Sequence, residues 1–225
     1  MDKPASTIPV PVSAPRRVQW RGFLLDEARH FFGKEAVKAL LERMAEHGLN
    51  VFHWHLTDDQ GWRIDLPGMP ELVRFGARRS SSPLPGEDDS SDGTPYGPFF
   101  YTEDDIREIV AFASGLGIAV MPEIDLPGHV RALLAAHPEF ACEGVSLPRE
   151  PLCSYGICQD VLCPGSGAAV AFCERLLDAV CGLFRRNSSI SAATNARRRA
   201  GRRVPGARRA FCRKACRTSP PCRAG

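Results

Sequence analysis

Three short apolar segments alternate with segments of helical periodicity, and this alternation constrains the fold more than any other feature of the sequence. The apolar segments span residues 18–26, 50–56 and 117–125. Their length and their β-branched and aromatic side chains predict β-strands. From Lys34, and again after Thr102, apolar residues recur every three or four positions, which predicts amphipathic helices. The pattern therefore indicates an α/β fold built on a parallel sheet.

Local signals place the ends of the predicted helices. Gly48 stands where a helix C-cap is expected, and the run from Thr102 to Asp105 resembles a capping box that opens the next helix. A short helix is expected near residues 130–136, and a last helix is expected to end near Phe184. Between the second strand and Thr102 the sequence predicts a long loop, because no sustained periodicity is visible there.

Two of the predicted strands end in polar residues. The second strand runs into His55-Leu56-Thr57-Asp58-Asp59, and the third ends in Glu123-Ile124-Asp125. Polar side chains at the carboxyl ends of parallel strands are typical of the (β/α)₈ barrel, whose active sites lie at that face. Only three of the eight strands are recognisable. We therefore expect a partial barrel of about three βα units.

The chain has two parts of different composition. Residues 187–225 contain ten Arg, one Lys and no acidic residue, so they carry a charge of +11. Because the whole chain carries +3, the part that precedes Asn187 carries −8. The basic segment has few large apolar side chains, too few to offset chain entropy, and is expected to be disordered. The predicted organisation is a flexible lead-in over 1–17, a partial barrel domain over 18–186 and a basic tail over 187–225.

The sequence gives no sign of a membrane span or of a secretory signal. No run approaches the roughly 18 apolar residues of a spanning helix, and the first residues lack a charged segment followed by an apolar one. The expected location is the cytoplasm. Of the nine cysteines, none forms a Cys-x-x-Cys pair, which favours free thiols over a disulfide or a metal site. No metal and no cofactor is predicted.

Four motifs, taken together and in this order, identify a resemblance. They read RGFLLDEARHF, HWHLTDDQGWR, PEIDLPGH and VLCPG, and they begin at Arg21, His53, Pro122 and Val161. The combination resembles the family 20 glycoside hydrolases, which are β-N-acetylhexosaminidases. The resemblance covers roughly residues 20–184.

The resemblance implies hydrolysis of terminal non-reducing N-acetyl-D-hexosamine residues from β-linked glycosides with retention of configuration. The mechanism in this family is substrate-assisted, since the 2-acetamido oxygen of the substrate attacks the anomeric carbon. The enzyme supplies an Asp that orients the acetamido group and an adjacent Glu that protonates the leaving oxygen. The implied partner is an N-acetylhexosamine-containing oligosaccharide or glycoconjugate.

The matched positions imply supporting roles for four residues. Arg21 resembles the arginine that binds sugar hydroxyls, a task that suits the planar fork of a guanidinium. Asp58 and His129 resemble groups that hydrogen-bond around the catalytic Glu, and Asp125 is expected to orient His129. Each position also has a structural alternative. Arg21 could be a surface arginine, Asp58 a turn cap, His129 a helix-start residue and Asp125 a loop acid.

The catalytic Asp-Glu pair of the family is missing from the sequence. The family carries it in a Gly-Gly-Asp-Glu motif expected soon after Phe184, where residues 187–196 instead read NSSISAATNA. Codons formed from the third base of each residue and the first two bases of the next can spell Phe-Ile-His-Leu-Gly-Gly-Asp-Glu-Cys. This compatibility predicts a frameshift, in the gene or in its sequencing, between residues 185 and 187. The chain is therefore expected to have no catalytic residue of its own.

Two other interpretations stay open. The charge of +11 over positions 187–225 could bind nucleic acid, but the tail has a single aromatic residue, Phe211, and no known binding module. The domain could also be a non-catalytic sugar-binding remnant that uses Arg21 and its neighbours. Against this, the sugar site of the family is assembled from loops around the whole barrel.

Overall fold

The computed structural model describes residues 18–83, 91, 93–156 and 158–184. The predictions for the lead-in over 1–17 and the basic tail over 187–225 lie outside these residues. The elements, in chain order, are β1 (Gly22–Asp26), α1 (Lys34–Glu46), β2 (Val51–Asp58), β3 (Gly61–Trp62), α2 (Pro70–Gly76), α3 (Glu103–Gly115), β4 (Ala119–Ile124), α4 (Arg131–Ala136), η1 (Pro138–Phe140) and α5 (Gly167–Leu183). The α/β fold class is confirmed.

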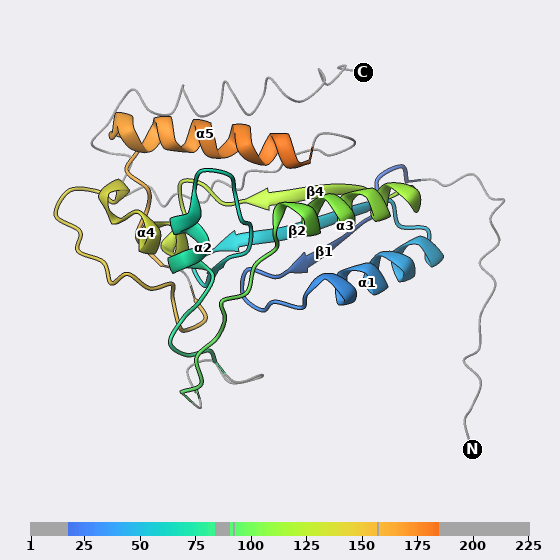
Figure 1. Ribbon diagram of the computed structural model, residues 1–225, viewed down its shortest axis with the longest axis horizontal. Helices are drawn as coiled ribbons and strands as arrows, with labels where there is room; N and C mark the ends of the chain where they lie inside the picture. Colours follow the sequence, from blue (N-terminus) through green and yellow to red (C-terminus); the bar gives the residue numbers. More distant parts are fainter. Residues whose placement is uncertain (1–17, 84–90, 92, 157, 185–225) are drawn as a thin grey trace.

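The three predicted strands form a parallel sheet in the order β1-β2-β4, and the short β3 pairs antiparallel with the end of β2. The register aligns Asp26 with His55 and His55 with Glu123. All three parallel strands point the same way in Figure 1, with α2 and α4 near their carboxyl ends. Polar residues that end these strands are thus brought to a single edge of the sheet.

One face of the sheet lies in the hydrophobic core. Phe52, Trp54 and Leu56 of β2 are fully buried in the cluster that also holds the apolar residues of α1, α3 and α5. Burial of each such side chain contributes about 1.5–3 kcal/mol, so this face anchors the domain. His53 and His55 alternate with these residues and point to the opposite face, as expected for a strand. The regular alternation ends at the register shift between His55 and Thr57, after which Asp58 lies beside His55.

The predicted helix ends are confirmed at two positions. Thr102 and Asp105 form a reciprocal capping box at the start of α3, and Gly48 has a φ of 69° just after α1. The region predicted to be a single long loop, however, contains β3 and α2. The helix α2, opened by Pro70, is too short to show a helical period. Within the described residues, no helix has the length and apolarity that a membrane crossing requires.

Candidate active site

Three carboxylates meet at the carboxyl edge of the parallel sheet. Asp26 ends β1, Asp58 ends β2, and Asp125 directly follows β4. Asp58 and Asp125 are almost fully buried, with exposed fractions of 2% and 4%. Buried carboxylates are costly unless cations and hydrogen-bond donors surround them. Two cationic side chains, Arg29 and His55, surround these carboxylates and form the site with them.

Arg29 is the first of these cations. Its Nη1 lies 2.7 Å from Asp26 Oδ2, its Nη2 lies 2.6 Å from Asp58 Oδ2, and its Nε donates to Gln60 Oε1 at 2.9 Å. Burial opposes the charge, but the nearby carboxylates of Asp58 and Asp26 raise the pKa of the guanidinium. The side chain is 28% exposed, so the fork is fixed in orientation and still reachable from solvent.

His55 is the second cation and lies among all three carboxylates. Its Nδ1 is 3.4 Å from Asp26 Oδ1, and its Nε2 is 3.3 Å from Asp58 Oδ2 and 3.4 Å from Asp125 Oδ2. Burial lowers the pKa of the imidazole, but hydrogen bonds to Asp125, Asp26 and Asp58 outweigh it and raise the pKa to about 12. His55 is therefore an imidazolium at neutral pH. It holds the carboxylates together rather than exchanging protons.

His129 pairs with the opposite side of Asp58. Its Nδ1 lies 3.2 Å from Asp58 Oδ1 and 3.5 Å from Asp59 Oδ2. Its φ of 56° is in the left-handed region, which residues other than glycine adopt at a cost when surrounding contacts enforce it. Asp59 is itself fixed by the backbone N–H groups of Arg131 and Cys158, at 3.1 and 3.0 Å. A carboxylate pair thus sets the orientation of one partly exposed imidazole.

Of the four residues predicted from the sequence, the structure brings Asp58 and His129 into contact and places Asp125 nearby. Asp125, however, does not orient His129 as expected. Its carboxylate pairs with His55, while Oδ1 is buried with no hydrogen-bond partner among the described residues. The short strand-to-loop step after β4 aims Asp125 at β2. The carboxylates beside His129 are those of Asp58 and Asp59.

Arg21 does not join this cluster. It precedes β1, at the amino edge of the sheet, whereas the cluster lies at the carboxyl edge. Its Nε donates to Gly48 O at 2.7 Å, and its Nη1 donates to Val18 O and Gln19 O at 2.6 and 3.0 Å. These bonds satisfy backbone carbonyls before β1 and at the turn between α1 and β2. The arginine that the structure places among the acids is Arg29.

Two buried charged residues hold the loop that carries Arg29. The carboxylate of Glu27 accepts hydrogen bonds from Trp54 Nε1, the Tyr101 hydroxyl, and the backbone N–H groups of Phe32 and Gly33. Arg63 is fully buried, and burial lowers its pKa to about 10. Its guanidinium donates to four backbone carbonyl oxygens, those of Glu27, Ala28, Ala77 and Phe99. The hydrogen bonds of Glu27 and Arg63 therefore fix the loop after β1 against the core.

Gly61 makes room for this support. A Cβ at Gly61 would lie 2.3 Å from Arg63 Nη2 and 2.6 Å from Ala28 O, both far inside van der Waals contact. A side chain there would displace the guanidinium from the loop carbonyls. The Gly-Trp-Arg run is thus one packing unit, and Trp62, also buried, donates to Ile64 O rather than facing a ligand.

In the part of the chain that the structure describes, two groups of side chains have the spacing of metal ligands. They are His55 with Asp58 and Asp125, and Asp58 with Asp59 and His129. In the first group, hydrogen bonds to the carboxylates raise the pKa of His55 to about 12, so the imidazole acts as their counter-charge. In both groups, Asp58 already has Arg29 as its counter-charge. The cluster is balanced by its own cations, and its chemistry is that of oriented hydrogen bonds.

Comparison with known proteins agrees with the motifs. Residues 18–192 match the catalytic domain of glycosyl hydrolase family 20. The chain belongs to this family. The match includes every residue of the acid cluster. The family 20 domain is therefore a glycoside hydrolase domain by descent.

The family 20 chain is similar to several known proteins over part of their length. It is 42% identical over 167 residues to a beta-hexosaminidase of Porphyromonas gingivalis and 39% identical over 168 residues to one of Vibrio furnissii. These matches cover 73% and 75% of this chain, and 20% and 27% of the two relatives. The chain thus spans only a fifth to a little over a quarter of their lengths.

Solved structures show the same relationship. A beta-N-acetylhexosaminidase crystal structure superposes with a TM-score of 0.72 at 34% identity, covering 88% of this chain and 40% of that chain. A mutant Streptomyces plicatus beta-hexosaminidase in complex with product (GlcNAc) superposes with a TM-score of 0.68 at 33% identity, covering 80% and 33%. The family 20 chain corresponds to one portion of these larger proteins.

The sequence prediction did not include Arg29 or His55, which the structure places among the carboxylates. A signal was available for Arg29, because the Asp26–Arg29 turn lies at the carboxyl end of β1, as Asp58 and Asp125 lie at the carboxyl ends of β2 and β4. Arg21 precedes β1 and lies at the opposite edge of the sheet. No local signal reports that His55 is protonated, because this depends on the carboxylates of Asp26 and Asp125, which are distant from it in the sequence.

Proposed function

We propose that the described residues form the sugar-orienting and acid-supporting side of a β-N-acetylhexosaminidase active site, built on the first three βα units of a (β/α)₈ barrel. The observation that carries this proposal is the linked arrangement of Arg29, Asp58 and His129 at the carboxyl edge of the sheet. The proposed substrate is a terminal non-reducing N-acetyl-D-hexosamine in a β-linked oligosaccharide or glycoconjugate. The hexosaminidase names of the relatives and the GlcNAc complex support this substrate class.

The geometry suits each step assigned to it. The partly exposed fork of Arg29 presents parallel N–H donors, which match adjacent sugar hydroxyls. Its two carboxylate partners fix the fork before substrate arrives, so little entropy is lost on binding. Asp58 contacts Nδ1 of His129, which leaves Nε2 available to a neighbouring acid. In the family mechanism that acid is the Glu that protonates the leaving oxygen.

In the proposed reaction the substrate itself supplies the nucleophile. The 2-acetamido oxygen attacks the anomeric carbon as the bond to the leaving oxygen breaks, and the Glu gives its proton to that oxygen. Water, deprotonated by the same Glu, then attacks the anomeric carbon and releases the acetamido oxygen. Two inversions leave the configuration retained. An Asp beside the Glu stabilises the positive charge that develops on the acetamido group.

The chain with this sequence does not perform the reaction. The Asp-Glu pair is replaced by the sequence of residues 187–196. Burial raises the pKa of Asp59 and of Asp125, but these side chains are only 0% and 4% exposed, so neither reaches a glycosidic oxygen. Asp26 and Asp58 are ionised, because hydrogen bonds from His55 and the charge of Arg29 lower the pKa of each carboxyl against the effect of burial. His55 is locked as a cation. General acid catalysis contributes about 10²–10⁴-fold, and acetamido orientation is lost as well.

The test compares two forms of the gene in a chromogenic β-N-acetylglucosaminide assay. We expect no turnover from the unedited chain, and turnover once a single-base edit near codon 186 restores the frame and the downstream sequence is translated. Replacing the Glu of the restored motif with Gln should abolish that turnover. Family-typical hydrolysis by the unedited chain would show that another residue is the acid. Saturable binding of N-acetylglucosamine without turnover is expected only if Arg29 and its partners suffice to hold the sugar.

A further inference from the structure

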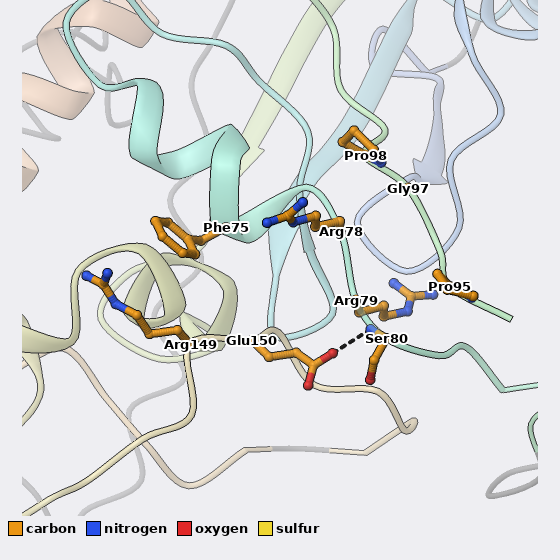
Figure 2. Close-up of a pocket in the computed structure, with 9 residues that line it drawn as sticks. All are labelled: Phe75, Arg78, Arg79, Ser80, Pro95, Gly97, Pro98, Arg149 and Glu150. Atoms are coloured by element: carbon orange, nitrogen blue, oxygen red, sulfur yellow. Dashed lines mark hydrogen bonds between the residues drawn. The ribbon is translucent and has the colours of Figure 1, made fainter. Parts of the chain in front are cut away.

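A pocket among the described residues lies apart from the acid cluster. It has a volume of about 410 Å³ and is bordered by the turn after α2 and by the segment that contains Arg149 and Glu150 (Figure 2). Phe75, Pro95 and Pro98 give it apolar walls. Its volume falls in the range of about 300–1,000 Å³ that is typical of small-molecule sites. The pocket is large enough for a ring-sized ligand.

The charge that lines this pocket is mainly positive. Three guanidinium groups border it, from Arg78, Arg79 and Arg149, against the single carboxylate of Glu150. Within the described part of the chain, none of the three pairs with a carboxylate, whereas other exposed arginines do, namely Arg43, Arg74 and Arg107. Glu150 accepts a hydrogen bond from the backbone N–H of Ser80. Among the described residues that line the pocket, positive charge is therefore in excess.

Arg78 and Arg149 lie on either side of the Phe75 ring, and both have N–H donors that no described residue accepts. Arg149 stands over Phe75, its guanidinium carbon 4.7 Å from the ring centroid, and makes one long hydrogen bond of 3.5 Å to Ala136 O. Arg78 is exposed and forms no hydrogen bond or ion pair with any other described residue. Figure 2 shows its guanidinium directed toward Phe75 from the side opposite Arg149. Arg74 also lies near this ring, its guanidinium carbon 5.2 Å from the centroid, so Arg78 and Arg149 offer a negative group two separate binding positions.

The third arginine connects the pocket wall to the acid cluster. Arg79 is 4% exposed and stacks on Tyr96, its guanidinium carbon 4.1 Å from the ring centroid. Its Nη1 donates to Gln60 O at 2.8 Å and its Nη2 donates to Arg29 O at 2.9 Å. Its Nε is buried with no partner among the described residues. The wall of the pocket is thus continuous with the loop that carries Arg29.

We propose that this pocket binds an anionic sugar unit, carboxylated or sulfated, with its negative group held by Arg78 or by Arg149 and its ring packed against the proline walls. Guanidinium groups bind carboxylate and sulfate oxygens through paired, charge-assisted hydrogen bonds. The apolar C–H face of a pyranose ring suits flat aromatic and proline surfaces. The site is separate from the acid cluster and does not depend on turnover, so its test is independent of the proposed hydrolysis.

The experiment titrates the full chain, residues 1–225, with glucuronate, glucose 6-sulfate and glucose, using calorimetry at low and moderate salt. We expect both anionic sugars to bind with similar affinity, weakening as salt rises, and glucose to bind far more weakly. The variant R78A/R149A should lose about tenfold or more in affinity, since each charged hydrogen bond is typically worth about one factor of ten. R78K/R149K keeps the charges but not the guanidinium forks, so its affinity should lie between those of the unaltered chain and R78A/R149A. R107A, which removes an exposed charge elsewhere, should not change it.

Three results would overturn the proposal. Equal binding of glucose and glucuronate would mean that the arginines do not recognise the charge. Anion binding that R78A/R149A leaves unchanged would belong to the basic residues 187–225 instead. A lack of saturable binding to either anionic sugar, in a chain whose circular dichroism shows the α/β fold, would mean that the pocket takes no such ligand. Because Arg78 and Arg149 are both exposed, the double variant is expected to retain the fold.

Discussion

Nη2 of Arg29 lies 2.6 Å from Oδ2 of Asp58, and this contact joins the loop after β1 to the end of β2. The same carboxylate uses its other oxygen to contact Nδ1 of His129 at 3.2 Å. Asp58 therefore links an arginine that can face the sugar with an imidazole that can face the acid. Disturbing it should affect both functions.

The Arg29–Asp58 pair should contribute strongly to stability. R29A removes the nearest cation from the buried Asp58 carboxylate and leaves it the contacts with His55 and His129. We therefore expect the free energy of unfolding in urea to fall by about 1–3 kcal/mol, at most the low end for broken buried pairs. Loss of the exposed Arg107–Glu103 pair in R107A should cost less than about 0.5 kcal/mol. In the double variant R29A/D58N much of the loss should be recovered. Equal effects of R29A and R107A would mean that the pair is not buried in solution.

His55 should remain protonated across the neutral range. Its pKa in the folded state, about 12, is raised above its unfolded value of about 6.5, so its contribution to stability is complete below pH 6.5 and is lost as the pH rises toward 12. Ring ¹⁵N chemical shifts should show both nitrogens protonated from pH 6 to pH 9. His30, whose pKa is lowered by burial, serves as the control and should be neutral at pH 7.5. A midpoint for His55 near 7 would contradict the charge balance of the cluster.

Glu27 should support the Arg29 loop through its hydrogen bonds. In E27Q one acceptor oxygen becomes a donor that faces the N–H and O–H groups of Trp54 and Tyr101. We expect the free energy of unfolding to fall by about 1–3 kcal/mol, the cost of leaving a buried group unsatisfied. The matched variant E35Q, on a side chain that is 84% exposed, should change it by less than about 0.5 kcal/mol. Urea unfolding curves of the two variants make the comparison.

The sequence is sufficient for the three parallel strands and the main helices because their signals are local. The strand at residues 51–58 has a run of apolar and aromatic side chains, and the Thr102–Asp105 capping box acts within a single helical turn. The short α2 and β3 leave no such periodic trace. They form because Leu72 and Trp62 are buried in the tertiary core, so their stability comes from contacts that the local sequence does not encode.

The site was only partly predictable for a related reason. Asp58 and His129 stand out because each follows a strand within a recognisable motif. The choice between Arg21 and Arg29, which lie in the same motif, depends on which end of β1 each occupies. The protonation of His55 depends on three carboxylates that only the folded sheet brings together. Long-range charge balance is a property of the fold, and the sequence pattern does not show it.

Asp58 should also matter for catalysis once the reading frame is restored. In D58N the neutral amide replaces the carboxylate that contacts His129 and Arg29. The imidazole of His129 then loses the charge that orients it, and the guanidinium of Arg29 loses one of its two carboxylate partners. We expect kcat to fall by an amount up to the roughly 10²–10⁴-fold that general acid catalysis contributes, with a smaller rise in KM. The exposed D104N is the matched control and should leave both constants unchanged. R29K in the same background should mainly raise KM, because a lysine keeps the charge but not the fork. If D58N raised KM and left kcat intact, Asp58 would act on the sugar through Arg29 alone, and the pairing with His129 would have no part in proton transfer.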